Sequence, residues 1–422
     1  MVKGWRELGC IVEHMKVLNH ISTLYRVPPG GDQGFVDAIS DAALAWDGEQ
    51  IVYAGPQAGL PPALASAERL DAGGRCVIPG LIDCHTHLCF GGWRGDEFAA
   101  RLAGASYQDI QAAGGGINST VARTRAASAA ELAAKAGLVL ADMARLGVTT
   151  VEAKSGYGLD QASEIKQLEV YRRLNDSQPL DIVPTFLGAH LVPVEYRDRR
   201  TDYLDLLCQS LIPEVAARDL ARFCDVFIED NAFTLAEGRQ ILETAKAHGL
   251  GLKIHADQLS AGGGAGLAAE LGAVSAEHLE YASAADIQAM AEAGTVAVSL
   301  PLASMYLREP FLPARQWIEA GARVAVATDF NPGSAPSYHL HLAMTLACIH
   351  QQMTPAEVLK AATSHAARAV ALHESHGSLL PGYRADFAII DAPDINHWLY
   401  HFRPNACIAT IKAGRAVFDG GL

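Results

Sequence analysis

Short apolar runs alternate with longer amphipathic stretches through the middle of this chain. Eight runs are rich in apolar or β-branched residues, and they span residues 76–83, 148–154, 182–189, 223–229, 252–255, 274–278, 296–300 and 324–329. Helical patterns lie between them, as at 129–146, 161–174, 235–248 and 283–293, the last with Ser283 as a plausible N-cap. Strand and helix that alternate eight times predict an α/β fold, a (β/α)8 TIM-type barrel.

The two ends of the chain have a different pattern, typical of β-structure. A strand-like stretch at 42–54 surrounds the turn Asp47-Gly48, and further β character appears at 385–391 and at 407–418, around Ala413-Gly414. We therefore expect residues 1–74 and 376–422 to form one small composite β-sandwich domain, beside a barrel domain of residues 75–375.

Composition and charge narrow the class of protein. The chain has 422 residues, 50% of them hydrophobic and 19% charged, which favours a globular protein over a disordered one. The formal net charge of −14 disfavours nonspecific binding to nucleic acid or to an anionic membrane surface. We expect neither partner, although a metal ion and a few arginines can still attract a small anionic substrate.

Targeting and redox signals point to the cytoplasm. Glu13, His14 and Lys16 interrupt the only early apolar run that could form the core of a signal peptide, and no apolar stretch has the length of a membrane span. The eight cysteines form no CxxC pair, so we expect reduced thiols rather than disulfides. A cytoplasmic enzyme is the interpretation that these signals favour.

Polar residues follow the apolar runs at their far ends. They are His85, His87, Lys154, His190, Glu229, His255, His278 and Asp329. Because barrel enzymes carry their catalytic groups at the carboxyl ends of the strands, this placement predicts one active site at the mouth of the barrel.

The segment His85-Thr86-His87 predicts a metal site. Residues two apart in an extended strand point to the same side, so both imidazoles can reach one ion. His255 and Asp329 are the natural third and fourth ligands, and imidazole with carboxylate suits zinc or iron better than calcium or magnesium. Taken alone, His255 could be a hydrogen-bonded core histidine and Asp329 a turn carboxylate.

Proton transfer has two candidates at this site. His278 ends the sixth run, where it could hydrogen-bond the attacking water or the carbonyl group under attack. Asp329 could both bind the metal ion and accept a proton. A buried structural histidine is the alternative interpretation of His278.

Several longer motifs resemble those of one known family. The run 79–125, which includes AGGGI, is joined by EAKSGYG at 152–158, TFLGAH at 185–190, HADQLS at 255–260 and DFNPGS at 329–334. Together they cover nearly the whole predicted barrel. The His-x-His element is shared across the amidohydrolase superfamily, whereas the other segments resemble the imidazolonepropionase family specifically.

The resemblance implies an activity, a cofactor and an assembly. The family hydrolyses 4-imidazolone-5-propanoate to N-formimidoyl-L-glutamate in histidine degradation, by adding a metal-activated water to the ring carbonyl and breaking the ring C–N bond. It binds one zinc or iron ion per subunit, which here would be held by His85, His87, His255 and Asp329. Homodimerisation is a further expectation from the family.

The resemblance also implies a set of substrate contacts. By position these are Arg94, Tyr157, His190, Gln258, Asn331, Gly333 and Ser334. An arginine can bind the propanoate tail bidentately. The alternatives are a solvated Arg94, a packing role for Tyr157 and a purely structural turn at 331–334. Some members carry Glu in place of Gln258, and because Gln cannot act as a base, proton transfer here should rely on His278, Asp329 or both.

The number of metal ions follows from the position of one lysine. Binuclear relatives usually carry a carboxylated lysine on the fourth barrel strand, whereas Lys154 ends the second predicted run and Glu229 the fourth. This favours one metal ion and leaves Lys154 with a structural or substrate contact, or an ion pair with Glu152 or Glu164.

Two other functions stay open at this point. Another cyclic amidohydrolase, or a ring deaminase acting on a small carboxylate-bearing heterocycle, would use the same metal ligands. A barrel without catalytic activity, kept as a scaffold, is disfavoured because all four candidate ligands are present.

Overall fold

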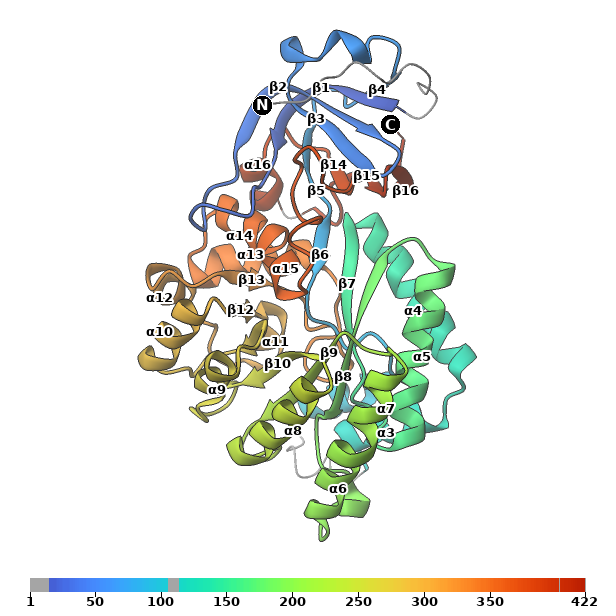
Figure 1. Ribbon diagram of the computed structural model, residues 1–422, viewed down its shortest axis with the longest axis vertical. Coiled ribbons are helices and arrows are strands. Elements are labelled where there is room, and N and C mark those ends of the chain that lie inside the picture. Colours follow the sequence, from blue (N-terminus) through green and yellow to red (C-terminus); the bar gives the residue numbers. More distant parts are fainter. Residues whose placement is uncertain (1–14, 105–113, 402, 422) are drawn as a thin grey trace.

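A computed structural model of the chain describes residues 15–104, 114–401 and 403–421. A helix-covered barrel forms the larger part of the molecule, and a β-rich part built from both terminal regions lies at one end of it (Figure 1). Residues 105–113 of the family-like run, and Cys10, lie outside the described residues. The other seven cysteines are free thiols.

The barrel consists of eight parallel strands in sequence order. They are β6 (Leu81–Asp83), β7 (Val148–Lys154), β8 (Asp181–Ala189), β9 (Phe223–Ile228), β10 (Gly251–Ala256), β11 (Ser275–His278), β12 (Val296–Ser299) and β13 (Val324–Val326). The segments that follow β6 and β13 meet through a parallel bridge between Thr86 and Phe330. The predicted barrel is therefore confirmed.

Helices cover the outside of the barrel (Figure 1). They include α3 (Ile117–Ala126), α4 (Ala129–Arg145), α5 (Gln161–Ser177), α6 (Arg200–Leu206), α7 (Ile212–Ala217), α8 (Leu235–Ala247), α9 (Gly264–Leu271), α10 (Ala284–Ala293), α11 (Pro301–Leu307), α12 (Ala314–Glu319), α13 (Leu340–Gln351), α14 (Pro355–Ala361) and α15 (Ser364–Ala369). Local capping explains where several of them begin. Ser283 accepts a hydrogen bond from the Asp286 backbone, as predicted, and Ser128 and Glu131 form a reciprocal capping box on α4.

The first predicted strand, 76–83, is divided between two sheets, which corrects the sequence interpretation. Its first half, β5 (Cys76–Pro79), pairs with strands of the terminal sheet, and only β6 joins the barrel. The change occurs at Gly80, where a Cβ atom would lie 2.4 Å from the Thr149 side chain. The predicted domain division at residue 75 stays a prediction, while the chain itself passes between the sheets at Gly80.

The terminal regions form one eight-stranded sheet. Its order is β16-β15-β14-β5-β1-β2-β3, with β4 paired to β1. The strands are β1 (Met15–Tyr25), β2 (Ala38–Asp47), β3 (Gln50–Pro56), β4 (Glu68–Asp71), β5, β14 (Phe387–Ile390), β15 (Cys407–Lys412) and β16 (Arg415–Asp419). The sheet curls so that its two halves face each other, as in a sandwich: the rings of Trp46 and Phe387 pack 5.1 Å apart between centroids, and the Ile51 backbone donates to Tyr383.

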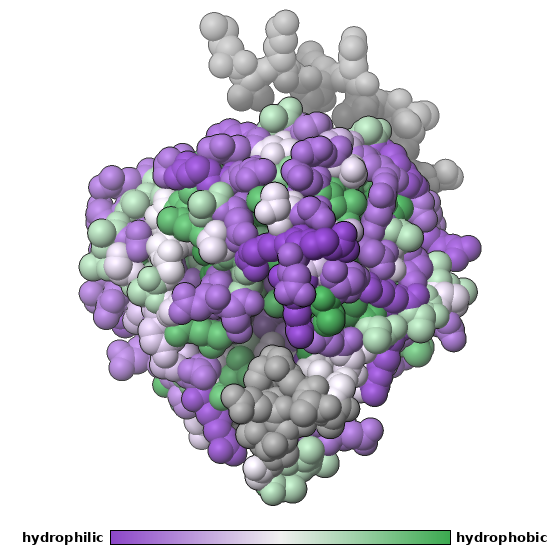
Figure 2. All heavy atoms as spheres, turned by 90° about the horizontal axis from the view of Figure 1, so that it is seen from below, coloured by the Kyte–Doolittle hydropathy of each residue, from purple (hydrophilic) through white to green (hydrophobic). Residues whose placement is uncertain are grey.

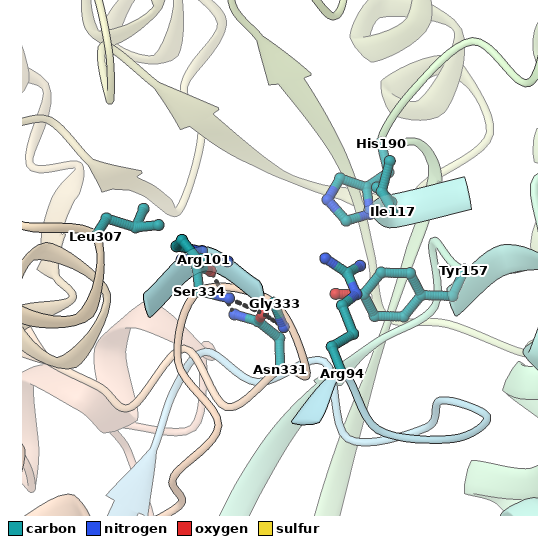
Figure 3. Close-up of a pocket in the computed structure, with 9 residues that line it drawn as sticks. All are labelled: Arg94, Arg101, Ile117, Tyr157, His190, Leu307, Asn331, Gly333 and Ser334. Carbon is teal, nitrogen blue, oxygen red and sulfur yellow. Dashed lines mark hydrogen bonds between the residues drawn. The ribbon is translucent and has the colours of Figure 1, made fainter. Parts of the chain in front are cut away.

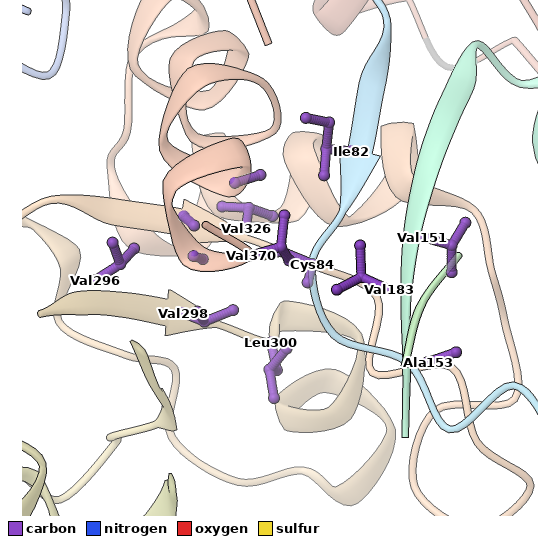
Figure 4. Close-up of a cluster of buried hydrophobic side chains, with 14 of the residues drawn as sticks. Ile82, Cys84, Val151, Ala153, Val183, Val296, Val298, Leu300, Val326 and Val370 are labelled. Carbon is purple, nitrogen blue, oxygen red and sulfur yellow. The ribbon is translucent and has the colours of Figure 1, made fainter. Parts of the chain in front are cut away.

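Buried apolar side chains pack on the barrel strands and against the helices around them. Ile82, Cys84, Val298 and Val326, all buried, gather there from neighbouring strands (Figure 4). The molecular face away from the terminal sheet is mainly hydrophilic, with small groups of hydrophobic residues (Figure 2). Within the described residues, no helix has the length and apolar character of a membrane span.

Candidate metal centre and active site

His85 and His87 lie just beyond β6 and flank the bridge residue Thr86. The His87 backbone donates to Phe330, and the Asp329 backbone donates to His85, so the two segments are held side by side. β13 ends at Val326 and not at the predicted residue 329, and Asp329 has a φ of 54°, in the left-handed region, so it lies in a turn and not in a strand. The turn brings the carboxylate of Asp329 next to both imidazoles.

Four potential ligand atoms converge at the base of the barrel mouth. Asp329 Oδ1 lies 3.4 Å from His85 Nε2 and 3.4 Å from His87 Nε2, and His255 Nε2 lies 3.5 Å from His87 Nε2. All four side chains are buried. Burial, together with neighbouring positive groups, lowers the pKa of His85 and His87 well below 6.5, which favours the neutral imidazoles that metal ions bind.

The donor set fits a metal ion. Both ring nitrogens of His85 are buried without a hydrogen-bond partner in the described part of the chain, an arrangement that is costly unless something binds them. Three imidazole nitrogens and one carboxylate oxygen are a ligand set that zinc and iron accept, with room left for substrate.

A buried ionic network supports His255 from behind. Its Nδ1 lies 3.0 Å from Asp225 Oδ2, and Lys154 Nζ lies 2.8 Å both from Asp225 Oδ2 and from Glu152 Oε1. Burial lowers the pKa of Lys154, but Asp225 and Glu152 more than offset this and raise it above 10.5. Lys154 is thus a charged ammonium group within a structural network.

This network settles the predicted ion pairs of Lys154. The pairing with Glu152 is confirmed, whereas that with Glu164 is wrong, because Glu164 accepts hydrogen bonds from backbone amides, including those of Gly156 and Gly158. Sequence reasoning missed Asp225. Its signal was a lone carboxylate in the middle of an apolar strand run.

His278 lies beside the metal-ligand cluster. Its ring centroid is 5.5 Å from that of His255 and 6.0 Å from that of His85. Burial lowers the pKa of His278 to about 3. Its Nδ1 faces Glu280 Oε2 at 3.9 Å. Glu280 was also missed by sequence reasoning, because its relevance depends on a turn that the pattern does not reveal.

Two adjoining cavities lie above the ligand cluster. The larger, of about 390 Å³, is lined by Arg94, Arg101, Ile117, Tyr157, His190, Leu307, Asn331, Gly333 and Ser334 (Figure 3). The smaller, of about 70 Å³, includes His87, His255, Gln258, His278 and Asp329, and shares Tyr157, His190, Asn331 and Ser334 with the larger. The structure thus brings together the predicted metal ligands, proton-transfer residues and substrate contacts, with His85 buried beneath the smaller cavity.

Arg94, Tyr157 and His190 point into the larger cavity from three different segments (Figure 3). Arg94 Nε donates to Thr120 Oγ1 at 2.8 Å, which leaves the end of the guanidinium group toward the cavity. His190 Nδ1 lies 2.9 Å from the Gly156 carbonyl oxygen. Gly156 has a φ of 100°, and a Cβ atom there would lie 3.1 Å from His190 Nδ1, so a glycine is required.

The loop after Asp329 is organised by the side chain of Asn331. Its Oδ1 accepts from the backbones of Gly333 and Ser334, both at 2.8 Å, and its Nδ2 donates to the Asp329 carbonyl at 2.6 Å. A Cβ atom at Gly333 would lie 2.6 Å from Arg94 Nη1. The loop is therefore both a turn stabilised by its own hydrogen bonds and part of the cavity lining. A direct contact between Asn331 and the substrate stays a prediction.

Gln258 belongs to a loop that is held at both sides. Leu259 N donates to Glu229 Oε2 at 2.9 Å, and Asp257 accepts from the backbones of Gly263 and Ala265 at the start of α9, both at 2.9 Å. These contacts hold Gln258 at the smaller cavity.

Arg101 is a second cation in the larger cavity that sequence reasoning missed. It lies on α1 (Gly95–Leu102), seven residues after Arg94, which precedes that helix. Positions seven apart lie on one helix face, two turns from each other, and this spacing was the available signal.

Comparisons with known proteins agree with the fold and identify the family. The model of the amidohydrolase family matches residues 76–417. An imidazolonepropionase of Symbiobacterium thermophilum is 50% identical over 389 residues, 91% of each chain. One of Geobacillus thermodenitrificans is 49% identical over 358 residues, 85% of this chain and 84% of its own length.

Solved structures show the same fold at much lower identity. An adenosine deaminase from Xanthomonas campestris with bound zinc has a TM-score of 0.68 at 18% identity and covers 96% of this chain and 93% of its own. A guanine deaminase from E. coli has a TM-score of 0.67 at 14% identity and covers 96% and 99%.

Proposed function

The chain belongs to the amidohydrolase family and, within it, to the imidazolonepropionases, and we propose that it hydrolyses 4-imidazolone-5-propanoate to N-formimidoyl-L-glutamate in histidine degradation. The observation that carries this proposal is the convergence of three histidine nitrogens and the Asp329 carboxylate at the base of a cavity whose outer part holds Arg94 and Arg101. The metal-ligand cluster at the base of the cavity can act on a small ring, and the arginines in the outer part can bind a carboxylate tail on that ring.

One zinc or iron ion, held by His85, His87, His255 and Asp329, completes the site in this proposal. Such an ion supplies Lewis-acid activation of water and of the ring carbonyl. A single ion is favoured because Lys154 is already bound by Glu152 and Asp225 and so is not free to bridge two metals. Asp225 orients the imidazole of His255 through its Nδ1.

The larger cavity positions the substrate. The Arg94 guanidinium group binds the propanoate carboxylate, and Tyr157 and His190 contact the ring. Asn331 shapes its loop so that Gly333 leaves space for Arg94 and Ser334 lies next to Asp329. Orientation of the ring relative to the attacking water is itself a large part of the rate enhancement.

Proton transfer falls to His278 and Asp329 in this proposal. Gln258 lines the same small cavity and can hydrogen-bond the ring, but its amide cannot take up a proton. His278 accepts the proton of the attacking water and returns it to the ring nitrogen that leaves. Homodimerisation, expected from the resemblance, and a cytoplasmic location, expected from the targeting and redox signals of the sequence, complete the proposal.

A ring deaminase is the second candidate, favoured by the deaminases among the fold neighbours. Those neighbours share only the fold at their level of identity. Paired arginines in the substrate cavity favour a substrate with a carboxylate, and the relatives of high identity are imidazolonepropionases.

The decisive assay uses freshly prepared imidazolonepropanoate and follows loss of the ultraviolet absorption of its ring. We expect rapid loss with the purified, metal-loaded protein and formation of N-formimidoylglutamate in equal amount. Absence of turnover at micromolar enzyme, with bound metal confirmed by elemental analysis, would refute the proposed function.

A further inference from the structure

Two buried polar atoms face each other behind the smaller cavity without hydrogen-bond partners. They are His278 Nδ1 and Glu280 Oε2, 3.9 Å apart, and neither has a partner among the described residues. The side chains are only 4% and 2% exposed. Buried polar atoms of native proteins are nearly always bonded, and these two approach each other as a donor and an acceptor could.

The backbone turns both side chains to the same side. His278 and Leu279 have φ values of 74° and 70°, which are rare for residues with a side chain. The turn is fixed by two hydrogen bonds, from Leu279 N to the Ala256 carbonyl at 3.0 Å and from Tyr281 N to the Asp257 carbonyl at 2.8 Å. Such a strained turn indicates that the placement of these side chains matters.

The carboxyl group of Glu280 is held in place from α11. Ser304 Oγ donates to Glu280 Oε1 at 3.2 Å, which leaves Oε2 directed at the imidazole. Since Nδ1 of His278 points to Glu280, Nε2 is the ring nitrogen left for the cavity. Glu280 itself lies outside the group of His85, His87 and His255 atoms that could bind one ion.

We propose that Glu280 is the positioning residue of His278: its Oε2 accepts the Nδ1 hydrogen, so that the unprotonated Nε2 faces the cavity as the proton acceptor. This inference rests on the proposed function for the role of His278, but not for the contact itself. Closing the contact to hydrogen-bond length takes a shift of about 1 Å. A carboxyl group that accepts from the far nitrogen fixes both the tautomer and the direction of an imidazole.

The proton balance of the reaction follows. His278 Nε2 takes a proton from the attacking water as the oxygen bonds to the ring carbonyl carbon. When the ring C–N bond breaks, the same proton passes to the leaving nitrogen, and the Nδ1 proton stays between His278 and Glu280 throughout. No oxidant or second reactant is needed.

The test compares Glu280→Gln and Glu280→Leu with Glu292→Gln, which makes the Gln change on the exposed side of α10 (Ala284–Ala293). We expect kcat to fall by about 10–100-fold in both Glu280 variants, with KM and bound zinc unchanged, and no change in Glu292→Gln. Ser304→Ala, which removes only the support of Glu280, should lower kcat less. A kcat within twofold of wild type in Glu280→Leu, or a loss explained by loss of zinc, would overturn the proposal.

A second measurement does not depend on turnover. The measurement is 15N NMR of the zinc-loaded wild type labelled with 15N-histidine, in which the His278 signals are assigned by comparison with His278→Gln. We expect the wild type to show His278 protonated on Nδ1. In Glu280→Leu this preference should disappear. An Nε2-protonated ring in wild type would overturn the positioning role. If the wild type failed to open imidazolonepropanoate but showed the Nδ1-protonated ring, the proposed function would fail while the pairing stood.

Discussion

Two clusters of histidine and aspartate lie near opposite ends of the same barrel strand, β8. Only one of them has the unpaired ligand atoms that a metal ion would bind. At the carboxyl end, beyond Ala189, is the cluster of His85, His87, His255 and Asp329. Asp181, at the start of β8, belongs to the other cluster, with His376, Asp386 and Lys412. Both place several potential ligand atoms within reach of one ion.

The difference lies in what already occupies the centre of each cluster. Lys412 Nζ lies 2.6 Å from Asp181 Oδ2 and 2.6 Å from Asp386 Oδ2, and His376 Nε2 lies 2.9 Å from Asp181 Oδ2. Every donor therefore has a partner there, and the ammonium group supplies the cation. Around His85 the nitrogens converge on one another with no side-chain cation between them in the described residues. Residue type alone does not distinguish the two.

The largest expected effect separates the clusters directly. His255→Ala should lose bound metal and reduce kcat/KM at least about 1,000-fold, because Lewis-acid activation contributes several kcal/mol. His376→Gln should keep the metal stoichiometry and nearly the full rate, since it lies at the other end of the barrel. Elemental analysis and steady-state kinetics measure both, and loss of metal in His376→Gln would contradict the comparison.

A change of the central cation tests the junction cluster. Lys412→Met leaves two carboxylates without their ammonium partner in a largely buried place, and we expect a loss of about 3–5 kcal/mol in the free energy of unfolding. Lys16→Met, which removes an exposed pair with Glu68, should cost under about 1 kcal/mol. Urea denaturation monitored by circular dichroism gives both values. Equal losses would show that Lys412 is not the centre of its cluster.

The dependence of stability on pH provides a finer test. Burial raises the pKa of Asp181, but the hydrogen bonds from His376 and Lys412 outweigh it and lower the pKa below 3.8. A carboxyl group with a depressed folded-state pKa stabilises the protein above its unfolded pKa and ceases to do so as the pH falls. The urea midpoint should therefore decline below about pH 4 in wild type and decline less in Asp181→Asn. An identical decline would contradict the role of Asp181.

The smallest effect concerns the exposed cation at the cavity. Arg101→Ala should raise KM a few-fold and weaken its dependence on salt, with kcat unchanged, because an exposed charge mainly guides an anion toward the site. Arg172→Ala, an exposed position on α5, is the matched control. A drop in kcat instead would indicate that Arg101 takes part in orienting the ring.

Most of the barrel and of the site could be predicted because the signals are local. The alternation of apolar runs with helical patterns predicted the eight strands. The polar residues that follow the runs predicted the active site at the mouth of the barrel. The rest depends on contacts between distant segments. The need for glycine at position 80 comes from its contact with Thr149. Asp225 acquires its role from contact with His255, and Glu280 from contact with His278. The role of Lys412 depends on Asp181. None of these pairs has a pattern in the sequence that joins its members.

The passage at Gly80 has a consequence for the order in which this protein matures. β5, directly joined to the strand that leads to His85, is held between β1 and β14, and Cys76 and Ile390 of this contact are 314 residues apart. While the chain is being synthesised, the anchor of the first barrel strand waits for β14, which is made much later. Asp329 also comes late, so the ligand set is complete only when most of the chain has left the ribosome. The full set of candidate metal ligands can therefore come together only after the segment that carries Asp329 has been made.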